Sequence, residues 1–289
     1  MVTQPPQFSP KQIASALGVS ESSVKRWCDR GAIETVRTVG GHRKITQDGL
    51  QAFISETGRS LQDPQLVGLR TSVAAPIPGS DEPCKQKFRE ALVRGDEVTC
   101  RKVLFDRVKE AGSHAEVAES LITDAMRGIG EAWDCRQLDA YQERQGCNIC
   151  LRLINELRAD LPALPESAPV AIGGAPEGDP YQLPTAMVEL ALRETGWNAI
   201  SLGNNLPMDS YLQAAHDWSP RLVWLSVSSV ATPEMFIREQ NRLAAGLGED
   251  VALLIGGRAL CDKTRPRLRY TAHCDCIRNV VDLAGLMLL

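Results

Sequence analysis

The loop from residue 173 to residue 184 holds the side chains of this sequence with the clearest potential for ligand chemistry. It reads Gly-Gly-Ala-Pro-Glu-Gly-Asp-Pro-Tyr-Gln-Leu-Pro and stands between a predicted strand and a predicted helix. Open α/β sheets bind their ligands at such positions. Tyr181 can offer a phenolate oxygen, a donor that suits Fe(III) better than cobalt. The loop therefore largely decides which small molecule, if any, the chain can bind.

The cysteines and histidines form a pattern that favours structural roles. Nine cysteines are scattered along the chain, an odd number that suits reduced thiols better than a disulfide framework. Cys147 and Cys150 share one face of a predicted helix, where buried packing is a commoner reason than redox sensing. The segment from His273 to Cys276 lacks the second ligand pair of a zinc site. Since no catalytic triad order, phosphate loop or paired carboxylates occur either, we expect no catalytic residues, no metal site and no enzyme.

The first 60 residues predict a helix-turn-helix followed by a basic wing. Ser9 caps the first helix, Gly18 ends it, and Val24 and Trp27 lie on the apolar face of the second. The expected elements are helices at 10–17 and 20–31, an extended segment at 35–38, a turn at 39–42, a strand at 43–45 and a helix at 46–54. Eight Lys or Arg stand against five Asp or Glu in this segment, whereas the whole chain has a net charge of −4. A basic end on an acidic body indicates a polyanion partner.

The run from Gly40 to Ile45, Gly-Gly-His-Arg-Lys-Ile, resembles the wing of MerR-superfamily transcription regulators, and the resemblance covers roughly residues 7–57. Glycines permit a tight wing tip, from which basic side chains reach DNA phosphates while the second helix enters the major groove. The residues expected to contact double-stranded DNA are Glu21, Ser22, Lys25, Arg26, Gly41, His42, Arg43 and Lys44. The alternative is that the same fold serves a protein contact.

Three regions follow the predicted DNA-binding domain of residues 1–58. Residues 59–83 gather Pro, Gly, Ser and Asp, as a linker does. Residues 84–163 predict a four-helix bundle, with helices at 85–94, 96–111, 114–132 and 139–160. Residues 168–289 alternate helical stretches, the last at 281–289, with apolar runs at 170–173, 199–202, 222–227, 251–255 and 276–280. The fold class is therefore multidomain α and α/β: a winged helix-turn-helix, a four-helix bundle and a doubly wound parallel sheet.

The bundle and the sheet domain together resemble the cobalamin-binding module of light-sensing photoreceptor repressors in the MerR superfamily. In that family a bundle tryptophan and a Glu-His pair cover the upper face of the corrin; here Trp133 and Glu143 match, and Arg144 replaces the histidine. The loop resembles the family's Asp-x-His-x-x-Gly, whose histidine ligates cobalt, but Tyr181 stands at the histidine position and Pro184 at the glycine. The family's slot for the nucleotide tail is lined by positions that correspond to Ser226, Ser228, Gly256 and Gly257.

The loss of both histidines removes the imidazole nitrogens that would bind cobalt. Three outcomes stay open: cobalamin held without a protein histidine ligand, another tetrapyrrole such as haem or a bilin, or no ligand of this kind. The resemblance implies a transcription regulator in which a ligand between bundle and sheet alters oligomerisation, as a dimer or tetramer, and hence operator binding. The alternatives are a ligand-free regulator that acts through protein contacts and a corrinoid carrier.

The sequence shows neither a membrane span nor a signal peptide. No run of 18 apolar residues occurs, and the first residues contain neither a basic segment nor an apolar one. We therefore expect a cytoplasmic protein without a membrane partner.

Overall fold

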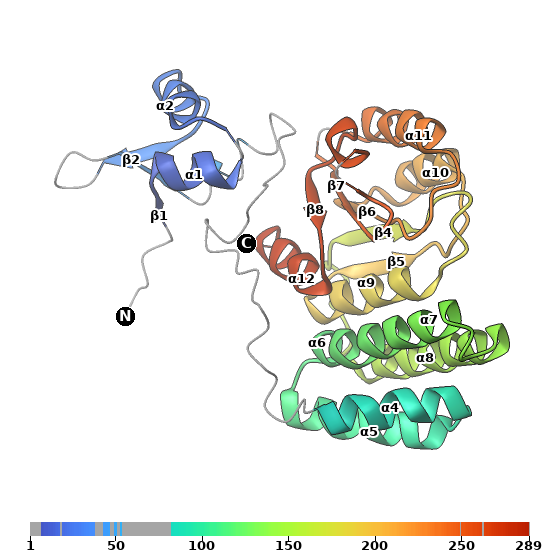
Figure 1. Cartoon of the computed structure of the whole chain (residues 1–289). Coiled ribbons are helices and arrows are strands. Elements are labelled where there is room, and N and C mark those ends of the chain that lie inside the picture. The colour runs from blue at the N-terminus through green and yellow to red at the C-terminus, as the bar shows by residue number, and fades with distance from the viewer. Residues whose placement is uncertain are drawn as a thin grey trace.

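The computed structural model describes residues 7–17, 19–37, 43–46, 49–50, 53, 82–248, 250–261 and 263–288. Among these residues, none of the helices has the length and apolar character that a bilayer-spanning helix needs. Figure 1 shows the helix-turn-helix elements, the bundle and the sheet domain along the chain.

The N-terminal domain contains two helices and a small antiparallel sheet. Its elements are β1 (Gln7–Phe8), α1 (Pro10–Ala16), α2 (Glu21–Asp29), β2 (Thr35–Arg37) and β3 (Arg43–Thr46), with strand order β1-β3-β2. Ser9 forms a capping box with Gln12, and the Ser20 side chain accepts a hydrogen bond from the Ser23 amide, so each helix begins at its polar cap. The sequence did not predict β1, because a two-residue strand has no periodicity to detect.

The third predicted helix lies largely outside the described residues. Gly49, Leu50 and Phe53 are helical, and Phe53 is buried in the core with Ile13 and Ile45. The Trp27 ring lies 4.9 Å from the Phe53 ring, which places Trp27 against the core as its position on the apolar face indicated.

The bundle consists of four helical segments joined by short turns. They are α4 (Glu82–Arg94), α5 (Glu97–Ala111), the path α6 (His114–Ala118), η2 (Glu119–Thr123) and α7 (Asp124–Asp134), and α8 (Ala140–Asp160). Asp96, Ser113 and Asp139 cap three of the helix starts, and Gly112 ends α5 with a left-handed backbone. The third segment is not a uniform α-helix, because a π-helical turn at η2 interrupts it.

The C-terminal domain is a parallel sheet of five strands. The strands are β4 (Val170–Gly174), β5 (Asn198–Ser201), β6 (Leu222–Ser226), β7 (Ala252–Gly256) and β8 (Ala272–Cys274), in the order β5-β4-β6-β7-β8. Helices α9 (Leu183–Glu194) and α12 (Ile277–Leu286) cover one face, and α10 (Met208–Trp218) and α11 (Pro233–Gly246) cover the other, while η3 (Arg265–Arg267) precedes β8. Strand order reverses at β4, so the topological switch point lies between β4 and β6.

The prediction of a fifth strand at 276–280 is wrong. The strand is β8 at Ala272–Cys274, and the apolar residues that follow begin α12 instead. Val280 and Ala284 are buried four residues apart on one helical face. A short apolar run does not distinguish a strand from a buried helix by its periodicity, and this one belonged to a helix.

Two carboxylates fix the bundle to the sheet domain. Glu194, at the end of α9, accepts hydrogen bonds from the backbone amides of His114 and Ala115 at 2.6 and 2.9 Å, at the start of α6. In the opposite direction, Glu119 of the bundle accepts one from the Ile277 amide at 2.7 Å, at the start of α12. Each domain thus caps a helix of the other, and we expect the two to behave as one module.

Replacing Glu194 with alanine should lower the free energy of unfolding by about 1–3 kcal/mol, because the amides at the start of α6 lose their acceptor. Urea unfolding of the full chain measures this. Glu166→Ala is the matched control, since Glu166 is exposed. Equal stability of the two variants would contradict a capping role for Glu194.

Candidate functional site

The outer surface of α2 carries the first group of predicted DNA contacts. Ser22, Lys25 and Arg26 are exposed, whereas Val24 and Cys28 on the opposite side are buried. Lys25 Nζ lies 2.8 Å from Glu21 Oε1, and this contact lowers the pKa of the Glu21 carboxyl. The helix therefore presents polar and basic groups on one side, as a recognition helix does.

The wing strand carries the second group. Arg43 and Lys44 lie in β3, while Gly41 and His42 lie outside the described residues. Arg43 Nη1 donates a hydrogen bond to Asp29 Oδ1 at 2.6 Å, and so ties the wing strand to the last residue of α2. Sequence reasoning missed this link, since nothing in the residue pattern pairs positions 14 residues apart.

The carboxyl ends of β4, β6 and β7 hold the ligand residues predicted in the sheet domain. Ser226 ends β6 and pairs in register with Gly256 at the end of β7. A Cβ at Gly257, where φ is +120°, would lie 2.3 Å from the Val227 carbonyl oxygen. The diglycine thus allows the backbone after β7 to approach the end of β6 closely.

Asp179, which was not among the predicted site residues, organises this edge of the sheet. Its side chain is fully buried and accepts three backbone hydrogen bonds. The Tyr181 amide donates to Oδ1 at 3.0 Å, and the amides of Ser228 and Ser229 donate to Oδ2 at 2.5 and 3.1 Å. The carboxylate therefore pins the loop after β4 to the segment after β6.

Tyr181 lies at the surface of this edge, with 37% of its area exposed. The Arg258 guanidinium carbon lies 4.8 Å from the centre of its ring, within the range of a cation–π contact. Arg258 Nε also donates to the Ser228 carbonyl at 3.2 Å. The position that holds histidine in the cobalamin family thus carries an aromatic ring with a cation against it.

Trp133, Glu143 and Arg144 lie at the end of the bundle formed by the turn from α7 to α8. Trp133 is 49% exposed in the last turn of α7, and the Arg144 side chain is 82% exposed near the start of α8. Arg144 Nε lies 3.5 Å from Glu143 Oε2. This end of the bundle therefore presents an exposed aromatic ring and an exposed cation that is paired with Glu143.

Helices α8 and α9, which connect the bundle to the sheet domain, show where the end of the bundle with Trp133 and Arg144 lies. His114 contacts both Asp160, at the end of α8, and Glu194, at the end of α9, at 3.0 and 3.2 Å. The two helices pack against each other and end together, and α8 has 21 residues against 12 in α9. At 1.5 Å per residue, α8 begins about 13 Å beyond the start of α9. The overhang carries Glu143 and Arg144 past the first turn of α9, which directly follows the loop of Tyr181.

The thiols near this overhang are not activated for chemistry. Cys150 is buried, and burial raises the pKa of Cys147 to about 12. Cys147 also donates to Glu143 Oε1 at 3.5 Å. A thiol with a raised pKa is a poor nucleophile, which agrees with the packing role expected for these two cysteines.

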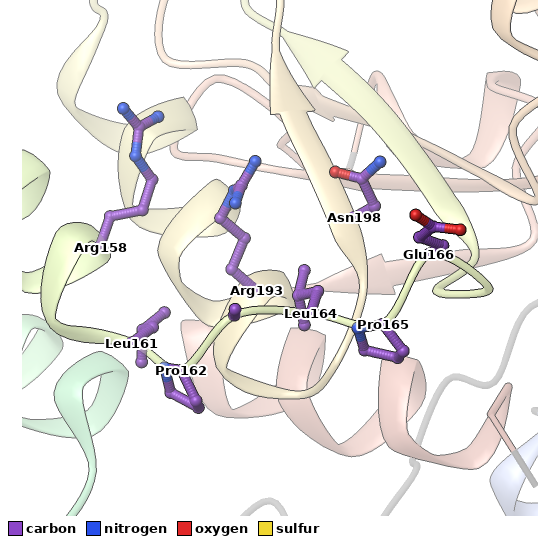
Figure 2. Close-up of a pocket in the computed structure, with 9 residues that line it drawn as sticks. Arg158, Leu161, Pro162, Leu164, Pro165, Glu166, Arg193 and Asn198 are labelled. Carbon is purple, nitrogen blue, oxygen red and sulfur yellow. The ribbon is translucent and has the colours of Figure 1, made fainter.

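A pocket of about 320 Å³ lies at the opposite edge of the sheet. Figure 2 shows it between the segment 161–166, which precedes β4, and Asn198, the first residue of β5, with Arg158 and Arg193 on the same side of that segment. A second hollow, of about 680 Å³, lies between α4 and the end of α7. Because the first pocket lies at the amino ends of the strands, it is separate from the predicted ligand residues.

Two family models match the chain. A helix-turn-helix domain matches residues 8–58, and a B12 binding domain matches residues 85–158. Both are binding domains, which agrees with the prediction that the chain is not an enzyme. The second match covers the bundle, the part of the module that carries Trp133 and Glu143.

Curated relatives fall into two groups. Dimethylamine corrinoid protein 2 of Methanosarcina acetivorans is 22% identical over 73% of this chain and 98% of its own length. The HTH-type transcriptional repressor CarA of Myxococcus xanthus is 22% identical over 78% of each chain.

A solved structure confirms the predicted fold class of the C-terminal module. The monomethylamine corrinoid protein of Methanosarcina barkeri superposes with a TM-score of 0.60 at 17% identity, over 73% of this chain and all of its own. The chain therefore combines a helix-turn-helix domain, a helical bundle that matches a B12 binding domain, and a doubly wound parallel sheet joined to that bundle.

Proposed function

We propose that this protein is a DNA-binding transcription regulator whose bundle and sheet together sense a flat ligand and thereby control assembly and operator binding. The observation that carries the proposal is the union, in one chain, of a helix-turn-helix domain with a B12-binding-like module. The similarity of the chain to the HTH-type transcriptional repressor CarA supports a regulatory function.

The DNA half of the proposal rests on α2 and the wing. In this proposal Glu21, Ser22, Lys25 and Arg26 on α2 face the major groove, and Arg43 and Lys44 on β3 face the DNA backbone. Because one small helix-turn-helix reads few base pairs, binding requires a dimer or tetramer. We therefore propose that the ligand acts by changing the assembly state of the protein.

The sensing half rests on the overhanging end of the bundle. Trp133 and Tyr181 are exposed aromatic residues at the bundle end and the strand-end edge of one module. Aromatic faces of this kind bind flat ligands by stacking, and Arg144 and Arg258 supply cations for acidic substituents. Trp133, Glu143, Arg144, Tyr181, Ser226, Ser228, Gly256 and Gly257 stay the proposed ligand residues.

A corrinoid carrier is the alternative that the relatives' names raise. A carrier does not need a helix-turn-helix domain, and Tyr181 lacks the imidazole nitrogen that ligates cobalt in the family. Both observations favour the regulator.

Ligand binding is expected to change operator affinity by about 5- to 150-fold, the usual range for coupling between two sites. The test titrates purified full-length protein with haemin, biliverdin or aquacobalamin, and follows absorption, sedimentation and binding to duplex DNA. A ligand that shifts both the assembly state and the DNA affinity supports the proposal. DNA binding with no response to any of the three indicates the ligand-free regulator, and no DNA binding rejects the regulatory reading.

A further inference from the structure

Trp224 fills the interior of the sheet domain directly below the strand-end edge. It lies in β6, is 2% exposed, and belongs to the buried cluster between the sheet and helices α9 and α12. Successive strand residues point to opposite faces, so Trp224 and Ser226 point to the same face, with the indole two residues deeper in the sheet.

The indole is held in place from two sides. Its Nε1 donates a hydrogen bond at 2.9 Å to Oγ1 of Thr185, a fully buried residue in the first turn of α9. Across the sheet, a Cβ added at Gly173 would lie only 2.1 Å from Trp224 Cδ2. Gly173 is thus the position on β4 over which the ring lies, and the ring closes the space between β4, β6 and α9.

This space is where a nucleotide tail would have to pass. The resemblance to cobalamin-binding domains assigns Ser226 to the wall of the tail slot, and the slot would continue inward along the same face. In this protein that path meets the Trp224 ring. Above it, Asp179 holds the loop down onto the segment after β6 through the amides of Ser228 and Ser229. The residues present therefore do not fit a corrinoid whose tail enters the sheet.

We infer that the module takes a tetrapyrrole without a nucleotide tail, which lies flat between the overhanging end of the bundle and the edge marked by Tyr181. The inference rests on the proposed sensing function and names the chemical class of its ligand. It excludes intact cobalamin bound with its tail in the domain.

The test compares ligands that share a ring and differ in the tail. Full-length protein is titrated with aquacobalamin and with diaquacobinamide, which has the corrin ring but no nucleotide, and also with haemin and biliverdin. We expect a tail-less compound to bind at least about tenfold more tightly than aquacobalamin, since the tail has no place to enter. Aquacobalamin that binds as tightly as cobinamide, or with its base released from cobalt in the absorption spectrum, overturns the inference. Failure of all four compounds to bind overturns it as well.

Trp224→Ala tests the same point from the protein side. Opening the space should raise the affinity for aquacobalamin relative to cobinamide by at least about tenfold. Trp197→Ala is the matched control, because Trp197 is equally buried in the same cluster but precedes β5 at the other edge of the sheet. An unchanged ligand preference in a folded Trp224→Ala variant counts against the inference, and if that variant does not fold the ligand series on the unaltered protein decides.

The readouts separate this inference from the proposed function. Ligand binding is read by absorption without DNA, and DNA binding is read without ligand. A protein that binds DNA but takes only cobalamin keeps the regulatory function and loses the inference. A protein that binds a tail-less tetrapyrrole but no DNA keeps the inference and loses the regulatory function.

Discussion

Replacing Lys25 and Arg26 together with alanine is expected to reduce the affinity for duplex DNA at least about tenfold, and to lower the salt dependence of binding by about two phosphate contacts. Both side chains are exposed on α2, opposite the buried Val24. Because neither side chain contributes to the core, the double variant should have nearly the same free energy of unfolding as the unaltered protein. The measurement is fluorescence anisotropy with a labelled duplex over a series of salt concentrations.

The matched control for this variant removes the same charge elsewhere. Lys87 and Lys102 are exposed on the bundle, and Lys102 pairs with Asp106 at 2.8 Å just as Lys25 pairs with Glu21. Lys87→Ala with Lys102→Ala should leave the DNA affinity and its salt slope nearly unchanged. If both double variants lose affinity equally, the protein responds to net charge and α2 is not the recognition helix.

Replacing Asp179 with alanine is expected to destabilise the sheet domain by about 3 kcal/mol, the second large effect. Three backbone amides donate to this fully buried carboxylate, and each buried donor left without an acceptor costs about 1–3 kcal/mol. Part of that cost is recovered, because water reaches the loop once the carboxylate is gone. Urea unfolding followed by tryptophan fluorescence measures the change, since Trp197 and Trp224 are both buried in this domain.

Two companion variants make the Asp179 result specific. Asp179→Asn keeps one carbonyl oxygen as an acceptor and should cost less than Asp179→Ala. Glu177→Ala removes an exposed carboxylate from the same loop and should change stability by less than about 0.5 kcal/mol. Equal effects of Glu177→Ala and Asp179→Ala would show that loop charge, not the three hydrogen bonds, is what matters.

Local signals in the sequence were sufficient for most of the secondary structure. Ser9, Ser20 and Asp139 cap helices because their side chains accept hydrogen bonds from amides within the next three residues, an interaction that depends only on near neighbours. The alternation of short apolar runs with helical stretches likewise predicted the parallel sheet, because each run and each stretch is recognised from residues that are close together in the chain. The error at 276–280 arose where a short apolar run carried no periodicity of its own.

The sequence by itself determined the order of the helical and strand regions, the amphipathic pattern of α2 and the strand-end edge of the sheet at which Ser226 pairs with Gly256. Only the tertiary structure decided that Arg43 bonds to Asp29, that Asp179 holds the loop to Ser228, and that Trp224 lies across Gly173 below Ser226. These contacts join residues 14 to 51 positions apart, so they depend on strand order and register, which bring distant segments together and leave no periodic trace in the chain. The types of side chain at the strand-end edge of the sheet could therefore be predicted from the sequence. The space that the packed side chains leave for a ligand could be determined only from the tertiary structure.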